Sequence, residues 1–136
     1  MALTFINTLK TSRADTIDTA IGSGGKLKVY SGTAPADVNG SLTGTTLLAT
    51  LTISGAFKSS NTNGVLTATA PGNATAVAGG AGTTATFFRL TTSADANVVQ
   101  GTVSDTAGNG DLKLNSASIS TGATVSVTSF VITEGN

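Results

Sequence analysis

The stretch Thr83–Asp105, "TTATFFRLTTSADANVVQGTVSD", places two β-prone runs on either side of a polar turn. The runs Thr84–Thr91 and Asn97–Ser104 are rich in β-branched and aromatic side chains, which favour strands. The "SADA" segment between them predicts a hairpin with a loop of about four or five residues. Similar alternation recurs on both sides of this stretch, so we expect an antiparallel β fold.

Alternation gives the first strand of this hairpin two different faces. Phe88 and Leu90 share one face, and Phe87 and Arg89 share the other. Arg89 has mostly apolar neighbours, so we expect a buried or interfacial side chain that forms a structural ion pair with a carboxylate. Recognition of a ligand by Arg89 is the alternative hypothesis.

The segment Asn7–Ile21 is the one stretch with helical periodicity. Asn7 or Thr8 is predicted to cap its start, and Gly22 is predicted to end it in a left-handed conformation. Its apolar residues approximate one face at helical spacing: Leu9, Ile17, Ala20 and Ile21.

Further alternating runs predict the remaining strands, and they are separated by segments rich in turn residues. In the run that starts at Thr45, we expect the buried face to consist of Leu47, Ala49, Leu51 and Ile53. A change of phase near Asn115–Ser116 predicts a bulge. The Gly- and Ala-rich segment 71–82 is either mobile or closely packed against a neighbour. The predicted strands occupy residues 26–32, 45–54, 65–70, 84–91, 97–104, 111–120 and 124–133.

About seven or eight short strands after one helix predict a mainly β fold. We expect a two-sheet antiparallel sandwich, either jelly-roll-like or a small barrel, preceded by the N-terminal helix. Residues 1–6 are predicted to be an N-terminal arm, and residues 7–136 a single β-sandwich domain that includes the helix at 7–21.

Composition argues against several classes of function. The 136 residues include no Cys and no His, so thiolate chemistry and His-based catalysis or metal binding are absent. Seven basic and seven acidic side chains give no net charge, so we expect no nucleic-acid partner. We expect no membrane span, because no run of 18 or more apolar residues occurs. The opening "MALTFINTLKTSRAD" lacks the features of a secretory signal.

Candidate catalytic and metal-binding patterns have simpler explanations. A Ser–Lys pair would need Lys26, Lys28 or Lys113, and nothing in the local sequence marks one. Most of the acidic residues lie in predicted turns, where they bond to their own backbone. Asp15 and Asp18 are instead expected as solvated charges on the helix surface.

Two glycine-containing motifs also fail on spacing. "DTAGNGD" (105–111) departs from the calcium-binding EF-hand pattern, and "GSGGK" (22–26) lacks the strand-before-helix order of a phosphate-binding loop. We therefore expect a protein that is not an enzyme and that uses no cofactor and no metal.

The order of several short motifs resembles a group of small structural proteins encoded in the virion gene clusters of tailed bacteriophages. The most specific part is "YSGTAP" followed by "LLA", and the resemblance covers nearly the whole chain. It implies a virion component, either a head decoration (cement) protein or a tail-associated one, and it transfers no catalytic residues. The motifs are "RADTID" (13–18), "GKLKVYSGTAP" (25–35), "TLLATL" (46–51), "FFRL" (87–90), "DLKLNS" (111–116) and "GATVSVTSF" (122–130).

The resemblance implies that the major capsid protein is the partner. It also implies a homo-oligomer, with a trimer favoured, made in the host cytoplasm and located on the capsid surface of the virion. We hypothesise that Leu3, Phe5 and Ile6 in the arm contact the partner. The alternative is that the arm frays or packs on its own domain. A tail- or fibre-associated protein and a carbohydrate-binding adhesin remain the other candidate functions.

Overall fold

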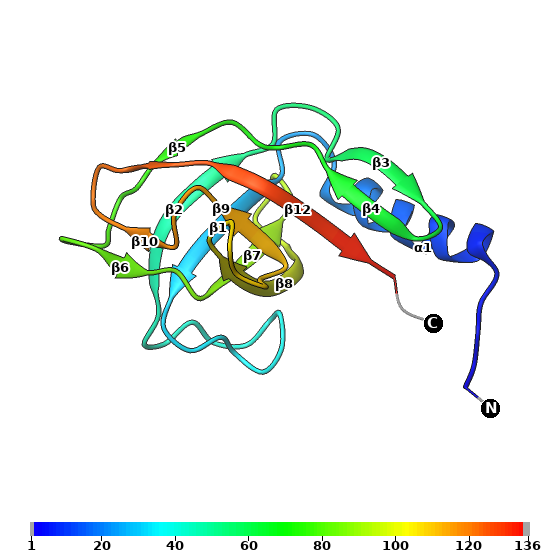
Figure 1. The fold of residues 1–136 in the computed structure, drawn as a ribbon, viewed down its shortest axis with the longest axis horizontal. Coiled ribbons are helices and arrows are strands. Elements are labelled where there is room, and N and C mark those ends of the chain that lie inside the picture. Colours follow the sequence, from blue (N-terminus) through cyan, green and yellow to red (C-terminus); the bar gives the residue numbers. More distant parts are fainter. Residues whose placement is uncertain (1, 135–136) are drawn as a thin grey trace.

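The computed structural model describes residues 2–134, in which one helix precedes twelve strands (Figure 1). The helix α1 spans Asn7–Ile21, as the sequence predicted. Among these residues no helix is both long enough and apolar enough to cross a membrane. The strands are β1 (Lys26–Ser31), β2 (Thr46–Thr52), β3 (Lys58–Thr62), β4 (Val65–Ala68), β5 (Ala74–Thr75), β6 (Thr83–Thr84), β7 (Phe87–Thr91), β8 (Asn97–Ser104), β9 (Leu112–Leu114), β10 (Ser118–Ile119), β11 (Thr124–Val125) and β12 (Val127–Thr133).

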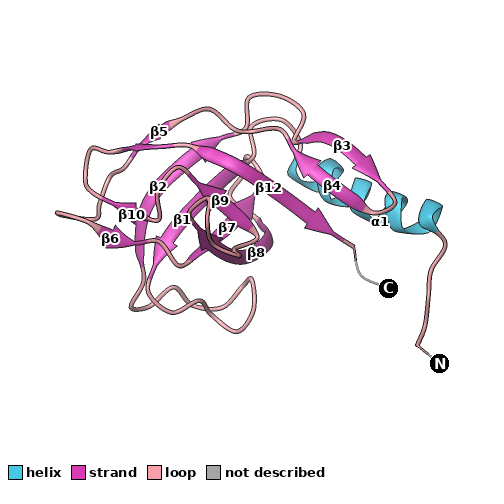
Figure 2. Cartoon of the chain, in the orientation of Figure 1, coloured by secondary structure: helices cyan, strands magenta, loops and turns pink. Residues whose placement is uncertain are grey.

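The predicted mainly β fold with an N-terminal helix is confirmed. Eight strands form one curled sheet in the order β2-β1-β7-β8-β9-β12-β4-β3, and two small sheets pair β10 with β6 and β11 with β5 (Figure 2). The sheet is antiparallel except between β8 and β9, where Val103 and Ser104 pair with Leu112 and Lys113 in parallel. The curled sheet encloses the core, so both walls of the sandwich come mainly from one sheet.

The predicted hairpin at Thr84–Ser104 forms strands β7 and β8. Phe88 and Leu90 point into the core, and the Phe88 ring contacts Phe130 edge-to-face at 5.0 Å. On the opposite face Phe87 stacks on Tyr30 at 5.1 Å between ring centroids. All five residues of β7 are buried, so the central strand is covered on both faces.

Two details of the strand predictions were wrong. Leu48, expected on the outer face of β2, is fully buried, because a register shift in the pairing with β1 places both Leu48 and Ala49 inside. Residues 55–64, expected as a loop, contain β3. The turn from β3 to β4 is made by Asn63 and Gly64, both with positive φ, which is typical of a two-residue hairpin.

The last two predicted strands are each divided between different sheets. Instead of a bulge near Asn115, the chain leaves the main sheet after β9 and pairs again as β10 with β6. The final run likewise divides into β11, which pairs with β5, and β12, which stays in the main sheet. Asn115 holds the crossing point, since its side chain accepts from the Ser126 amide and donates to the Thr124 carbonyl, both at 3.0 Å.

The small sheets and their connections form one end of the molecule, here called the uncharged tip (residues 74–84 and 118–125). The Gly- and Ala-rich segment is closely packed there. The amide of Val77 donates to Leu48 at 2.9 Å, and that of Gly122 donates to Ala76 at the same distance. Gly79 has φ +123°, and a Cβ at this position would collide with the carbonyl oxygen of Ile119. Glycine is therefore required where the two segments touch.

Helix α1 is attached to the β3–β4 hairpin largely by polar contacts. Ala14 and Ile21 are its buried residues, whereas Leu9 is 44% exposed, so the predicted apolar face was only partly correct. Gly22 ends the helix with a positive φ of +61°, as predicted, but its ψ of −172° lies outside the predicted left-handed helical region. Ile6 occupies the N-cap position, and no side chain caps the helix.

The two helix aspartates are bound rather than solvated. Asp18 accepts the backbone amide of Lys58 at 2.8 Å, and Asp15 accepts the Lys58 ammonium at 2.6 Å. Asn61 donates to Asp15 at 3.0 Å and to the Thr11 carbonyl at 2.9 Å. These bonds join the helix to β3 across forty or more positions of sequence, which explains why the sequence alone did not indicate them.

We predict that Asp18→Ala lowers the free energy of unfolding by about 1–2 kcal/mol, because the part-buried Lys58 amide loses its acceptor. The helix dipole alone predicts a small gain, since Asp18 lies in the last turn of α1. Urea denaturation distinguishes the two results. Asp18→Asn, which keeps an acceptor oxygen, is the matched control and should lose less; a stabilised Asp18→Ala variant would contradict the assigned bond.

Candidate functional site

The candidate site is the space between β8 and β12, which we call the β8–β12 groove. Strand β9 lies between these two strands but is only three residues long. On its β8 side it pairs with Val103 and Ser104, and on its β12 side with Val127, Ser129 and Phe130. Within residues 2–134, no strand lies between β8 and β12 beyond Leu112.

Local contacts at Asp111 explain why β9 starts where it does. Asp111 accepts the Thr102 amide at 2.9 Å and the Thr102 hydroxyl at 2.8 Å, and its own amide donates to that hydroxyl at 3.2 Å. Just before it, a Cβ on Gly110 would lie 2.6 Å from the Ser104 amide nitrogen, so only glycine lets the loop pass this close. Asp111 therefore closes one end of the groove.

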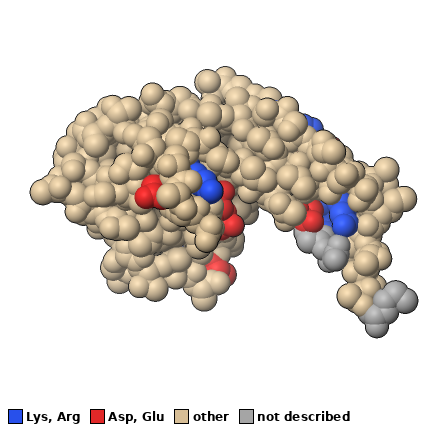
Figure 3. Space-filling view, in the orientation of Figure 1, with Lys and Arg blue, Asp and Glu red and all other residues tan. Residues whose placement is uncertain are grey.

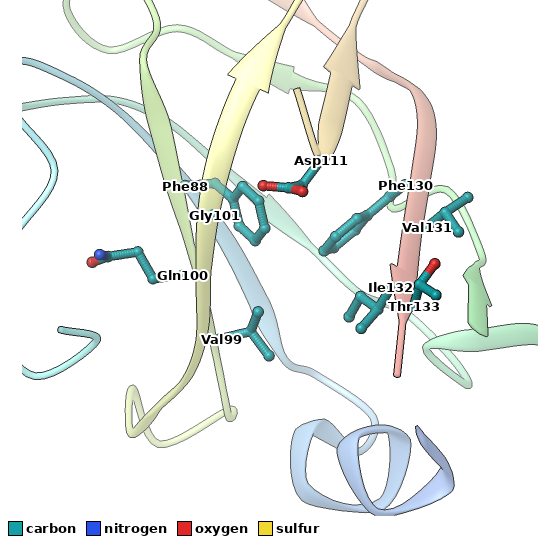
Figure 4. Close-up of a pocket in the computed structure, with 9 residues that line it drawn as sticks. All are labelled: Phe88, Val99, Gln100, Gly101, Asp111, Phe130, Val131, Ile132 and Thr133. Atoms are coloured by element: carbon teal, nitrogen blue, oxygen red, sulfur yellow. The ribbon is translucent and has the colours of Figure 1, made fainter. Parts of the chain in front are cut away.

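The groove has a volume of about 220 Å³. Figure 4 shows the Phe88 and Phe130 rings and the Val99 and Ile132 side chains around the space, with Asp111 at one end and α1 near the other. Pockets for small organic ligands usually occupy about 300–1,000 Å³. The groove is thus small for such a ligand, and its lining is mixed: apolar side chains such as Val99 and Ile132 lie beside polar groups of Gln100, Asp111 and Thr133.

Along the groove, β8 and β12 each have backbone N–H and C=O groups that pair with no other strand among the described residues. The Thr102 amide points away from β7, so by alternation the backbone N–H and C=O of Gln100 face the groove. The Glu134 amide bonds to the Gly64 carbonyl at the β4 side, so the backbone N–H and C=O of Thr133 face the groove from β12. Those of Val131 face Asp111 at the start of β9. Open strand edges of this kind are sites for pairing with another segment.

The groove offers little chemistry beyond pairing and apolar contact. Asp111 is its one ionisable side chain, and its carboxylate is used by Thr102. Throughout residues 2–134 no cluster of three or more acidic side chains could hold a metal ion. The arrangement can accept a strand or apolar side chains.

The residues predicted to contact a partner lie in an extended arm beside α1 (Figure 1). Leu3 is 73% exposed and Ile6 is 71% exposed. Phe5 is half-buried, with the Arg13 guanidinium 5.3 Å from its ring centroid. Arg13 also pairs with Glu134 at 3.0 Å. Met1 of the predicted arm lies outside the described residues.

Arg89 is buried, as predicted, but the predicted ion pair with a carboxylate was wrong. Within residues 2–134 its guanidinium donates to the Gln100 side chain at 2.9 Å and to the Gly40 carbonyl at 2.7 Å. Gln100 in turn donates to the Pro35 carbonyl at 2.8 Å. Arg89 therefore fastens the 32–45 loop over the outer face of β7 and β8, on the side opposite the groove.

We predict that Arg89→Lys destabilises the fold by about 1.5–3 kcal/mol, because an ammonium group cannot reproduce the forked contacts to an amide and a carbonyl. Amide hydrogen exchange should also become faster in residues 33–44. Arg89→Met, which removes the charge, is the comparison variant, and its stability should fall by at least as much as that of Arg89→Lys. If Arg89→Lys retained full stability, the positive charge rather than the two-partner geometry of the guanidinium would be the stabilising feature.

Asp95 in the β7–β8 turn is the most strongly perturbed acid. The Lys26 ammonium bonds to one oxygen at 2.8 Å and the Lys28 ammonium to the other at 2.7 Å. These bonds lower the pKa of Asp95 from 3.8 to about 2. Asp95 also adopts φ +65°, a left-handed conformation that Asp and Asn tolerate.

The depressed pKa of Asp95 makes stability depend on pH. The contribution is complete above the unfolded value near 3.8 and is lost as pH falls through about 2. We predict that Asp95→Asn shows a smaller loss of stability between these pH values than the native chain. Urea denaturation at a series of pH values measures this, and identical pH dependence in both chains would contradict it. The pKa of Asp15 is lowered by Lys58, so some dependence remains in the variant.

Sequence reasoning did not locate the groove, because the groove exists only where β9 is too short to fill the sheet. The change of phase near Asn115 marks the opposite end of β9, so it gave no signal for the groove, which opens beyond Leu112. No family model, curated protein or solved structure matches the chain.

Proposed function

We propose that this chain is a non-catalytic structural protein of a bacteriophage virion, which decorates the capsid lattice by binding the major capsid protein. The motif order from "YSGTAP" to "GATVSVTSF" supports the proposal through its resemblance to small virion proteins. The structural observation that carries it is the charge distribution, which leaves the uncharged tip available for contact with a protein surface.

The uncharged tip lies within two long segments without Lys, Arg, Asp or Glu, at 59–88 and 114–133. Strands β5 and β11 pair one segment with the other, as do β6 and β10. In Figure 3 the end of the molecule that carries β5, β6 and β10 shows neither blue nor red atoms. Val77 is 68% exposed there. Contact with a partner therefore requires no desolvation of a charged side chain at this end.

A weak contact is sufficient on a capsid because the lattice repeats it. A decoration protein that joins several copies of itself or several capsid subunits gains affinity from effective concentration. A surface of Thr, Ser, Ala and Gly on a hydrogen-bonded scaffold can contact a capsid subunit through complementary shape rather than through charge. The same features suit a tail or fibre protein of the particle, which differs only in where it is bound.

We predict that Val77→Asp reduces binding to empty capsids of the encoding phage by tenfold or more, because a charge would have to be desolvated in the contact. Ser59→Asp adds the same charge at an exposed position on β3 and should bind normally. Co-sedimentation with capsids measures both. Equal binding of the two variants would place the contact elsewhere.

Electron cryo-microscopy of the particle addresses the location and should show density on the head; density on the tail would favour the tail-associated alternative. Deletion of residues 2–6 tests the prediction that Leu3, Phe5 and Ile6 contact the capsid, and unaltered binding would reject it. A clear hit on a glycan array with no capsid binding would favour the adhesin.

A further inference from the structure

We propose that the N-terminal arm of one copy adds a strand in the β8–β12 groove of a second copy. The occupant is residues 3–6, Leu-Thr-Phe-Ile, and the interaction is an exchange of arms between identical chains. This inference goes beyond the proposed function and does not depend on it, because it concerns the protein alone in solution.

The width of the groove matches one strand. Strand β9 lies between β8 and β12 and pairs with both, so the gap beyond its end begins at the width of a single strand. Neighbouring strands lie about 4.8 Å apart, so where they flank β9 the strands β8 and β12 are separated by two such spacings, which leaves room for one backbone between them. The inserted segment would lie in line with β9 and end near Asp111.

The length of the groove matches the arm. On the β12 side the open edge runs over Val131–Thr133. At about 3.3 Å per residue, this edge accommodates a segment of roughly three or four residues. The arm supplies four residues between Ala2 and Asn7, where α1 begins. All four are β-branched, aromatic or leucine, which suits an added strand.

Side-chain alternation also matches. In an added strand Leu3 and Phe5 share one face, and Thr4 and Ile6 share the other. The groove is lined by apolar side chains, among them the contacting Phe88 and Phe130, together with polar groups of Gln100, Asp111 and Thr133. Phe88 and Phe130 are themselves buried, so Leu3 and Phe5 directed inward would contact the half-buried Val99 and Ile132 side chains. Leu3 now leaves 73% of its surface in water, so its burial supplies a hydrophobic driving force.

A second copy is a better source for this strand than the same chain. The arm of each chain runs away from its own sheets in Figure 1, and Arg13 holds Phe5 beside α1. The arm carries no charged side chain and so encounters no repulsion from Asp111. Exchange buries the arm and fills the groove of every copy, so the assembly closes into a dimer or a small ring.

Complementary variants provide the test. The full chain should sediment as a multiple of the mass of one chain, and Phe5→Asp should sediment as a monomer. Thr133→Pro removes a backbone donor from the groove edge while leaving the β4 side of β12 paired, so it too should be a monomer. Thr133→Val keeps the donor and is the matched control. Because Leu3 and Phe5 lie outside the core cluster, the arm variants test the proposal without disrupting the fold.

Mixing separates arm exchange from other contacts. A chain lacking residues 2–6 has a groove without an arm, and Thr133→Pro has an arm without a complete groove. Each should be monomeric alone, and an equal mixture should form one-to-one pairs that sediment as dimers. A monomeric full chain, or association that persists in both Phe5→Asp and Thr133→Pro, would overturn the proposal. A mixture that stays monomeric while both chains are folded by circular dichroism would also overturn it.

Discussion

The placement of β9 between β8 and β12 is the constraint on which the rest of the structure depends. Three residues, Leu112–Leu114, join two parts of the curled sheet, one by a parallel pairing and the other by an antiparallel one. Parallel neighbouring strands usually need a long crossover connection, yet here a loop of seven residues, Asp105 to Asp111, connects β8 to its parallel neighbour β9. Gly110 and the Asp111–Thr102 bonds make that short return possible.

The same constraint links the fold to the candidate site. Because β9 joins the sheet without filling it, Phe88 and Phe130 meet beneath a gap rather than beneath a complete strand. The charged residues lie mainly around α1, β1 and the loops, while the opposite end is charge-free. Two different surfaces thus suit two different contacts, the uncharged tip for a capsid and the groove for another copy.

Local signals were sufficient for part of this fold. The bounds of α1, the glycine that ends it and the β7–β8 hairpin were all predicted, because spacing and turn residues determine them within a few positions. The Asn63–Gly64 turn has an equally strong local signal, although residues 55–64 were predicted as a loop. Contacts between distant residues could not be predicted. Asp18 meets an amide forty positions away, and Arg89 meets a carbonyl in a loop that no pattern placed over β7.

The most direct measurement of the central claim is amide hydrogen exchange of the full chain at high and low concentration. At the groove edge, the amides of Gln100 and Thr133 should exchange slowly at high concentration and rapidly on dilution, because the added strand leaves when copies separate. Amides paired within the chain, such as Glu134 to Gly64, should exchange at the same rate in both. Fast exchange of the groove edge at every concentration would contradict the account.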